Sequence, residues 1–151
     1  MDAIKTAVVD CDAILARTAE FPAEVLEAGK KLKVVARHGV GVNNIDLAAA
    51  TRLGIQVTFT PLANSNTVAE QTIGMLLALS RNLLYIDRQF RQGNWEIRNK
   101  LQGNDLAGKT LGIAGLGRIG TLVAKKANAF DMKILAYDPY IDASRIPEYV
   151  T

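Results

Sequence analysis

Three glycines in the C-terminal part of the chain have the spacing that says most about chemistry. Gly115, Gly117 and Gly120 form the pattern Gly-x-Gly-x-x-Gly directly after the mostly apolar segment 109–114. When such a pattern joins a strand to a helix, bare backbone amides can approach a pyrophosphate group at the helix N-terminus. An ordinary strand-to-helix turn could use the same residues, so the neighbouring elements must decide between the two interpretations.

The segments around these glycines complete a strand–helix–strand unit. Residues 109–114 predict the first strand, helix-forming residues follow the glycines, and residues 132–137 predict the second strand. Gly115 then allows the tight turn and Gly117 keeps a side chain out of the path of the phosphates. Gly120 lets the helix lie close to the strand, so the whole unit favours nucleotide binding.

An acidic residue ends the second predicted strand. Asp138 stands 18 residues after Gly120, close to the spacing of about 20 at which a carboxylate meets the adenosine ribose hydroxyls. Asp138 would accept hydrogen bonds from both hydroxyls and repel a 2′-phosphate, so we predict NAD rather than NADP. The alternative is a turn residue before Pro139. Arg118, inside the glycine pattern, can add charge-assisted hydrogen bonds to the phosphates.

A second pair of glycines follows an earlier predicted strand. The segment 37–44 comes directly after the apolar residues 32–36, and ligands in open α/β sheets bind at the carboxyl ends of parallel strands. Backbone amides exposed by Gly39 and Gly41 could hold a carboxylate group. The alternative is a turn that only begins the next helix.

The composition is that of a globular protein with one cysteine. The 151 residues are 49% hydrophobic with a formal net charge of +3, which allows one domain with a core. Cys11 cannot form an internal disulfide, which favours a reducing compartment, and a small buried side chain explains it better than a nucleophile. No signal peptide is visible, and the longest strongly apolar stretch, 73–79, is too short to span a bilayer. We therefore expect a cytoplasmic protein without a membrane partner.

Basic residues gather in the middle of the chain. A solvated helical face accounts for them, and an anionic partner is the alternative. No aromatic-interleaved nucleic-acid motif supports that alternative, so we expect neither a nucleic-acid partner nor a metal site. The basic residues are Arg81, Arg88, Arg91, Arg98 and Lys100.

Short apolar segments alternate with helical patterns in the first 60 residues. Such alternation is typical of a parallel sheet covered by helices on both faces. The expected order is helix 3–8, strand 12–16, helix 22–29, strand 32–36, helix 45–53 and strand 55–59.

A more apolar helix follows. Thr67 and Glu70 fit a capping box, in which each side chain satisfies a backbone donor near the other. The helix beyond them is apolar on all sides, which predicts burial in a core or against another subunit. A second helix is expected over 84–91, and Trp95 is expected to anchor packing between segments. The apolar residues are Ile73, Met75, Leu76, Leu77 and Leu79.

Several of these segments together resemble the NAD-dependent D-2-hydroxyacid dehydrogenases, and most of all their D-3-phosphoglycerate dehydrogenase branch. They occur in family order across nearly the whole chain, although Asn43 replaces the Asp that is usual at that position. The matching segments are 37–46, 66–70, 93–95, 106–112, the glycine pattern and 136–139.

The resemblance implies roles for residues at two sites. In that family the loop around Gly39, Val40 and Gly41 binds the substrate carboxylate through its amides, and Val40 lies near the nicotinamide. Arg17 lies where some members carry an arginine for a substrate phosphate. The cofactor-binding positions implied for this chain are Gly115, Gly117, Arg118, Ile119, Gly120, Asp138 and Val40.

The resemblance also implies a fold. We expect an α/β protein with a parallel-sheet, flavodoxin-like piece of a substrate domain and the first βαβ unit of a Rossmann NAD-binding domain. The expected parts are the substrate-domain piece 1–62, the linking and dimerisation helices 63–104, and the NAD-binding half 105–151. The apolar helix from Thr67 usually contributes to a homodimer interface in this family.

The catalytic residues that the family supplies are not expected in this chain. Hydride transfer from a 2-hydroxy acid needs a base for the hydroxyl proton and benefits from an Arg clamp. The family's Arg, Glu and His lie beyond the second cofactor-domain strand, and His38 is interpreted as a loop side chain. The sequence therefore looks like an internal piece of a dehydrogenase, with negligible turnover expected.

Three hypotheses remain. The first is hydride transfer between NAD and a 2-hydroxy or 2-keto acid such as 3-phosphoglycerate, by a homodimer. The alternative is a non-catalytic nucleotide-binding or dimerisation module, as in corepressors that resemble this family. The third is a truncated product that folds only with a complementing partner.

Overall fold

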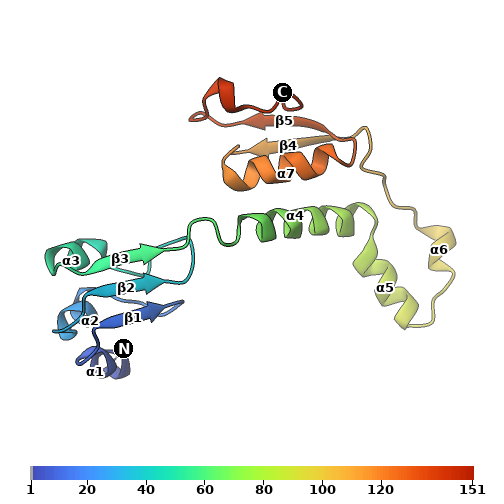
Figure 1. Cartoon of the computed structure of the whole chain (residues 1–151). Coiled ribbons are helices and arrows are strands. Elements are labelled where there is room, and N and C mark those ends of the chain that lie inside the picture. The colour runs from blue at the N-terminus through green and yellow to red at the C-terminus, as the bar shows by residue number, and fades with distance from the viewer. Residues whose placement is uncertain (1) are drawn as a thin grey trace. The chain divides into compact units, whose positions relative to one another are not determined.

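The polypeptide divides into two units, each with its own parallel sheet (Figure 1). The structure is a computed structural model that describes residues 2–151. We call Met1–Asn64 the N-terminal unit and Ser65–Thr151 the C-terminal unit. The α/β class with parallel sheets confirms the expected fold class, while the finer boundaries at residues 62 and 104 stay a prediction.

The N-terminal unit alternates helices and strands in the predicted order. Its three strands pair in parallel in the order β1-β2-β3. The elements are α1 (Asp2–Val8), β1 (Ala13–Ala16), α2 (Ala23–Ala28), β2 (Val34–Arg37), α3 (Leu47–Arg52) and β3 (Gln56–Phe59).

Local chemistry explains where the helices of this unit begin and end. Pro22 precedes α2 with φ −67°, which suits the entry to a helix, and the N–H of Gly29 closes the helix by donating to the Leu26 carbonyl. The Asp46 side chain accepts the Ala49 N–H at 2.8 Å and so caps α3.

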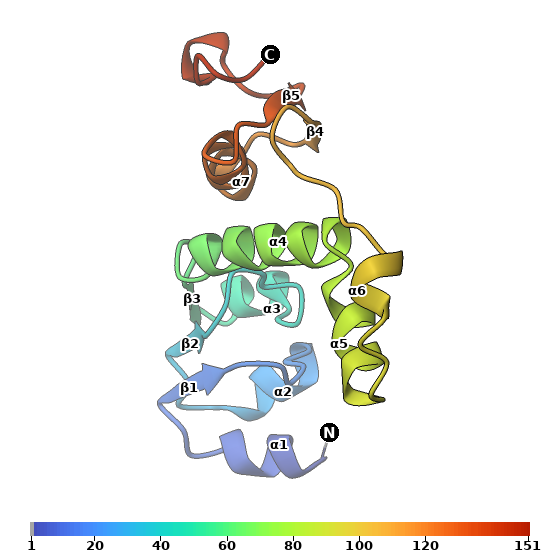
Figure 2. The same ribbon diagram turned by 90° about the vertical axis from the view of Figure 1, so that its right-hand side faces the viewer.

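The sheet of the N-terminal unit is covered on one face only. Figure 2 shows α1, α2 and α3 on the same side of the strands, where Ala16 and Val35 are buried, while Leu15 is 79% exposed. The prediction of a sheet covered on both faces is therefore wrong for residues 2–151. Each right-handed crossover moves on to the next strand in the same direction, so the connecting helices fall on one face.

The C-terminal unit begins with three helices and continues with a strand–helix–strand unit. Only β4 and β5 form its sheet, in parallel. The elements are α4 (Ser65–Ser80), α5 (Leu83–Arg91), α6 (Ile97–Lys100), β4 (Thr110–Ala114), α7 (Arg118–Asn128), β5 (Lys133–Tyr137) and the short 3₁₀ helix η1 (Ala143–Arg145).

The core of this unit lies between the sheet, α7 and α4. Helix α7 lies on one face of β4 and β5, and α4 runs along α7 (Figure 1). After η1 the chain returns to β5, where Val150 forms a parallel bridge with Ile134. The buried residues are Ala69, Ile73, Leu106, Leu116, Val123, Ala124, Ala127, Met132, Ile134 and Val150.

The capping box predicted at the start of α4 is wrong. The helix begins at Ser65, so Thr67 lies inside its first turn and cannot form the N-cap of a capping box. The Glu70 carboxylate instead accepts the Asn66 amide at 2.6 Å and lies 3.5 Å from the Lys126 ammonium. Within the described chain Leu79 is 78% exposed, so the core does not cover all sides of α4, and burial against another subunit stays a prediction.

Helices α5 and α6 form an arm that turns away from α4 at Asn82. Asn82 adopts φ 55°, a left-handed conformation that ends α4 sharply. Segment 101–106 passes so close to this turn that a Cβ at Gly103 would lie 2.8 Å from the Arg81 Cα. At the far end Trp95 packs on Phe90 with ring centroids 4.9 Å apart, yet it stays 60% exposed. Trp95 therefore anchors the arm locally but is not buried between segments.

Cys11 is half-buried and its Sγ donates to the Ala7 carbonyl at 3.2 Å, so it is less buried than predicted. Among residues 2–151, no helix combines the length and apolar character needed to cross a bilayer.

Candidate functional site

The loop between β4 and α7 has the conformation that its glycines predict. Gly115 adopts φ 93°, a left-handed conformation that side-chain-bearing residues rarely adopt. Its N–H donates to the Tyr137 carbonyl at 2.8 Å, which joins the loop to the end of β5. Gly117 then forms the N-cap of α7 with extended backbone.

Gly120 is required by a close approach rather than by its own backbone conformation. A Cβ at this position would lie 2.1 Å from the Gly115 carbonyl oxygen and 3.4 Å from the Ile113 side chain. Real Cβ contacts below 3.0 Å essentially do not occur. The third glycine therefore allows the first turn of α7 to lie directly against the end of β4, as predicted.

The first turn of α7 presents backbone donors at its open end. The first amides of a helix have no intrahelical acceptor, and the helix dipole favours negative charge there. Glycine at the N-cap has no side chain that could bond these amides, and the space around Gly117 is open to 4 Å. Arg118 and Ile119 in this turn are both exposed. An anionic group such as a pyrophosphate fits this end of the helix.

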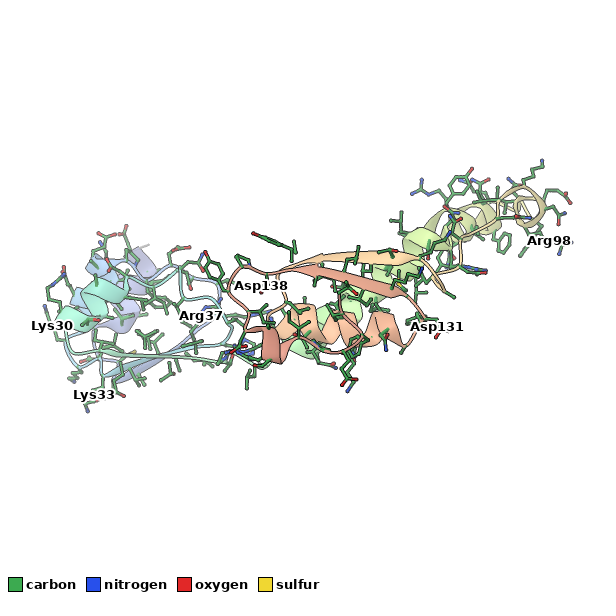
Figure 3. The ribbon with its side chains drawn as sticks, turned by 90° about the horizontal axis from the view of Figure 1, so that it is seen from above. Lys30, Lys33, Arg37, Arg98, Asp131 and Asp138 are labelled. Atoms are coloured by element: carbon green, nitrogen blue, oxygen red, sulfur yellow. The ribbon has the colours of Figure 1, made fainter. Side chains whose placement is uncertain are left out.

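Asp138 lies at the end of β5, beside the glycine loop (Figure 3). Its Oδ2 accepts the Leu116 N–H at 2.8 Å, and its Oδ1 accepts the Tyr140 N–H at 2.9 Å. The backbone N–H groups of Tyr140 and Leu116 hold the pKa of the Asp138 carboxyl below its ordinary value. The carboxylate is thus charged and oriented at neutral pH, and its remaining lone pairs can accept two hydroxyl donors.

A small apolar cavity adjoins Asp138. It encloses about 160 Å³, and such a lining suits the faces of a heterocyclic base next to a ribose. Sequence reasoning missed this cavity because part of its wall comes from Ile141, Ile146 and the returning segment 150–151, which carry no motif. The lining residues are Leu116, Ala136, Tyr137, Asp138, Ile141, Ile146, Val150 and Thr151.

The second candidate site is the loop after β2 in the N-terminal unit. Gly39 adopts φ 149°, and its N–H donates to the Thr60 hydroxyl at 3.1 Å. The Thr60 N–H in turn donates to the Gly39 carbonyl at 2.9 Å. Since the Gly39 amide is engaged by Thr60, the amides of Val40 and Gly41, both exposed residues, are the better placed donors for a carboxylate.

The Arg37 side chain holds this loop through two hydrogen bonds. Its guanidinium donates to the His38 carbonyl, and its Nε donates to the Asn44 Oδ1 at 3.1 Å. Asn44 is buried, at 8% exposure, and its amide donates to the Ala19 carbonyl at 2.7 Å. A Cβ at Gly39 would lie 2.5 Å from the Arg37 guanidinium. The base of the loop is therefore held by the partly buried contacts of Arg37 with Asn44 and of Asn44 with Ala19.

The other predicted residues of this unit lie at the same edge of its sheet. The parallel register aligns Ala16, Arg37 and Phe59, so Arg17 and His38 follow neighbouring strand ends. Both side chains are exposed. Arg17 and the glycine loop therefore follow neighbouring strand ends, and the Asn43 Oδ1 lies 3.1 Å from where a Cβ at Gly41 would stand.

The nucleotide-facing features fit one cofactor class. The apolar slot suits a base, the oriented Asp138 carboxylate suits a ribose, and the open N-terminus of α7 suits a pyrophosphate. This chemistry matches the adenosine diphosphate half of a dinucleotide.

Comparison with known proteins gives a consistent result. Residues 73–150 match the family model described as D-isomer specific 2-hydroxyacid dehydrogenase, NAD binding domain. The chain is 44% identical over 145 residues to a D-3-phosphoglycerate dehydrogenase of Mycobacterium tuberculosis, covering 95% of this chain and 27% of that protein. The chain thus spans about a quarter of the length of this curated relative.

Solved structures share the fold as well. A crystal structure of a protein from Thermus thermophilus matches with a TM-score of 0.91 and 35% identity, covering 97% of this chain and 48% of that one. A D-lactate dehydrogenase from Aquifex aeolicus, solved with NAD and lactic acid, matches with a TM-score of 0.81 and 30% identity. That match covers 93% of this chain and 42% of the other.

Proposed function

The chain belongs to the D-isomer specific 2-hydroxyacid dehydrogenases, and we propose that it serves NAD-dependent hydride transfer between a 2-hydroxy acid and the matching 2-keto acid. The observation that carries the proposal is the Asp138 carboxylate oriented beside the glycine loop at the N-terminus of α7. Relatives named D-3-phosphoglycerate dehydrogenase support 3-phosphoglycerate as the hydroxy acid.

NAD, when bound, supplies the hydride acceptor or donor, and this chain positions its adenosine half. The Asp138 carboxylate accepts hydrogen bonds from the ribose hydroxyls. The first amides of α7 bind the pyrophosphate, and the Arg118 guanidinium adds a positive charge to that contact. A 2′-phosphate would meet the Asp138 carboxylate, so NADP is disfavoured. Isothermal titration of the 151-residue chain with NAD and NADP tests this. Equal affinities for both would refute the role of Asp138.

The loop at residues 39–42 is proposed to bind the substrate carboxylate through the amides of Val40 and Gly41. In the same proposal, Arg17 at the neighbouring strand end pairs with a substrate phosphate. Amide NMR shifts on adding 3-phosphoglycerate or D-lactate test both parts. Arg17→Ala should weaken the response to 3-phosphoglycerate and leave the response to D-lactate unchanged.

Turnover by these 151 residues is proposed to be negligible. The family's base and its partner carboxylate are expected beyond β5, and the chain's only histidine, His38, is a loop side chain at the substrate edge. Absorbance of NADH with NAD and a 2-hydroxy acid tests this point. A rate within the usual enzyme range of about 1–1000 per second would refute it.

We also propose that the functional form is a cytoplasmic homodimer built through α4 and the arm. Leu79 and Leu84, each 78% exposed, and Met75, 58% exposed, leave a large apolar surface on these helices. Light scattering should give twice the chain mass of 16.3 kDa. Leu84→Glu should then give the monomer mass, whereas Gln92→Glu, a matched charge at the end of the arm, should not.

A further inference from the structure

Leu116, the residue between the first two glycines of the loop, has both backbone polar groups bound by side chains. Its N–H donates to the Asp138 Oδ2 at 2.8 Å, and its carbonyl accepts the Thr121 hydroxyl of α7 at 3.0 Å. The Leu116 side chain is 3% exposed, so packing holds the residue as well. The tip of the loop is therefore fixed from β5 on one side and from α7 on the other.

These two contacts set the directions of the peptide groups on either side of Leu116. The peptide between Leu116 and Gly117 is planar and trans, so its C=O and N–H point in opposite directions. A hydroxyl that holds the Leu116 carbonyl toward α7 therefore also orients the Gly117 N–H. In the same way the Asp138 contact orients the peptide between Gly115 and Leu116.

Resting on the nucleotide-binding role proposed above, we propose that Thr121 and Asp138 are positioning residues for pyrophosphate, acting through the Leu116 backbone. In this proposal Thr121 acts only through its hydrogen bond to the Leu116 carbonyl. Asp138 serves two purposes, because the carboxylate that accepts the ribose hydroxyls also anchors the loop that binds the next group of the same ligand.

Variants at Thr121 distinguish loop positioning from an effect of charge. Threonine and valine have nearly the same shape, and both are uncharged, so Thr121→Val removes only the hydroxyl. Thr121→Ser keeps the hydroxyl and removes a methyl group. Adenosine reaches the ribose and base positions, whereas ADP also reaches the amides of the loop, so the two ligands report on different parts of the site.

The test is isothermal titration of the full 151-residue chain and its variants with ADP and adenosine. Thr121→Val should weaken ADP binding about fivefold to tenfold, the value of one hydrogen bond, and leave adenosine binding within about twofold. Thr121→Ser should restore ADP binding. ADP binding unchanged by Thr121→Val, or an equal loss for both ligands, would overturn the role of Thr121. Failure of the wild-type chain to bind ADP would instead overturn the nucleotide-binding proposal, and this inference with it.

Asp138 is tested with inorganic pyrophosphate, because the two explanations then predict opposite signs. Loss of a negative charge alone should strengthen binding of an anion, whereas loss of the loop anchor should weaken it. Asp138→Ala is expected to bind pyrophosphate more weakly than the wild type, and equal or tighter binding would contradict the anchoring role. Should the variant not fold, the wild-type Leu116 amide proton shift serves instead. It should follow the ionisation of Asp138 in a pH titration, and a shift independent of pH would contradict the contact.

Discussion

Gly120→Ala tests the close contact on which the nucleotide loop depends. The new Cβ would lie 2.1 Å from the Gly115 carbonyl oxygen, about 0.9 Å inside the 3.0 Å limit of real contacts. The obstacle is backbone rather than a flexible side chain, so the cost falls at the upper end of the overpacking range, about 3 kcal/mol. Alanine in place of glycine in a helix returns about 1 kcal/mol. The net loss is about 2 kcal/mol.

The assay is thermal and urea unfolding followed by circular dichroism, with ADP titration on the same samples. For a unit of this size a loss of about 2 kcal/mol lowers the Tm by about 8–16 °C. ADP affinity should also fall, because the first turn of α7 must move away from β4. An alanine variant with a Tm within about 2 °C of the wild type and unchanged ADP affinity would refute the packing argument.

Two other glycines provide matched controls for this variant. Gly112 in β4 has nothing within 4 Å of an added Cβ, so Gly112→Ala should leave both stability and ADP binding intact. Gly117 has the same open surroundings and φ −72°, which alanine adopts without strain. Gly117→Ala should therefore keep the Tm and weaken ADP binding, because its methyl group occupies the path of the phosphates.

Three further predictions concern single side chains. The folded-state pKa of Asp138 is lowered by the backbone N–H groups of Tyr140 and Leu116, so its stabilising effect is present above the unfolded pKa of about 4 and is lost as the pH falls through the lower folded value. Asp138→Asn should accordingly reduce the urea midpoint near pH 7, with the difference shrinking below about pH 4. A difference that does not shrink as the pH falls below about 4 would contradict this. Asp46→Ala should destabilise the N-terminal unit by about 1 kcal/mol by removing the cap of α3, and Asp46→Asn should not. Thr67→Ala should change stability by less than about 0.5 kcal/mol, because α4 begins before Thr67. A loss of about 1 kcal/mol, as is typical for an N-cap residue, would show instead that Thr67 does cap the helix.

The order of strands and the nucleotide loop follow from local signals in the sequence. Gly115 is required by its left-handed backbone conformation, and Gly120 is required by the close contact of α7 with the loop. Both requirements select glycine, so they can be recognised in the sequence alone. The same is true of Asp138, whose position is set by the length of one helix and one strand. The strand segments were predicted within about two residues of their observed bounds.

The start of α4 was predicted at the wrong residue because local sequence signals do not determine it. Ser65, Asn66 and Thr67 are all good N-cap residues, so composition alone allows the helix to begin at any of them. The choice depends on packing of α4 along α7 and on the contacts of Glu70 with Asn66 and Lys126. The apolar cavity beside Asp138 has the same origin, because it exists only once the segment after η1 returns to β5.

The arm of α5 and α6 bears a residue whose fluorescence can report on association of two chains. Trp95 is the only tryptophan in the chain, and it lies on the arm against Phe90 with 60% of its surface exposed. Its fluorescence should therefore resemble that of a hydrated indole and remain nearly constant when ADP binds beside Asp138. Association of two chains through the arm would remove water from the ring and shift the emission to shorter wavelength. The molecule thus contains a natural optical reporter that distinguishes assembly from nucleotide binding.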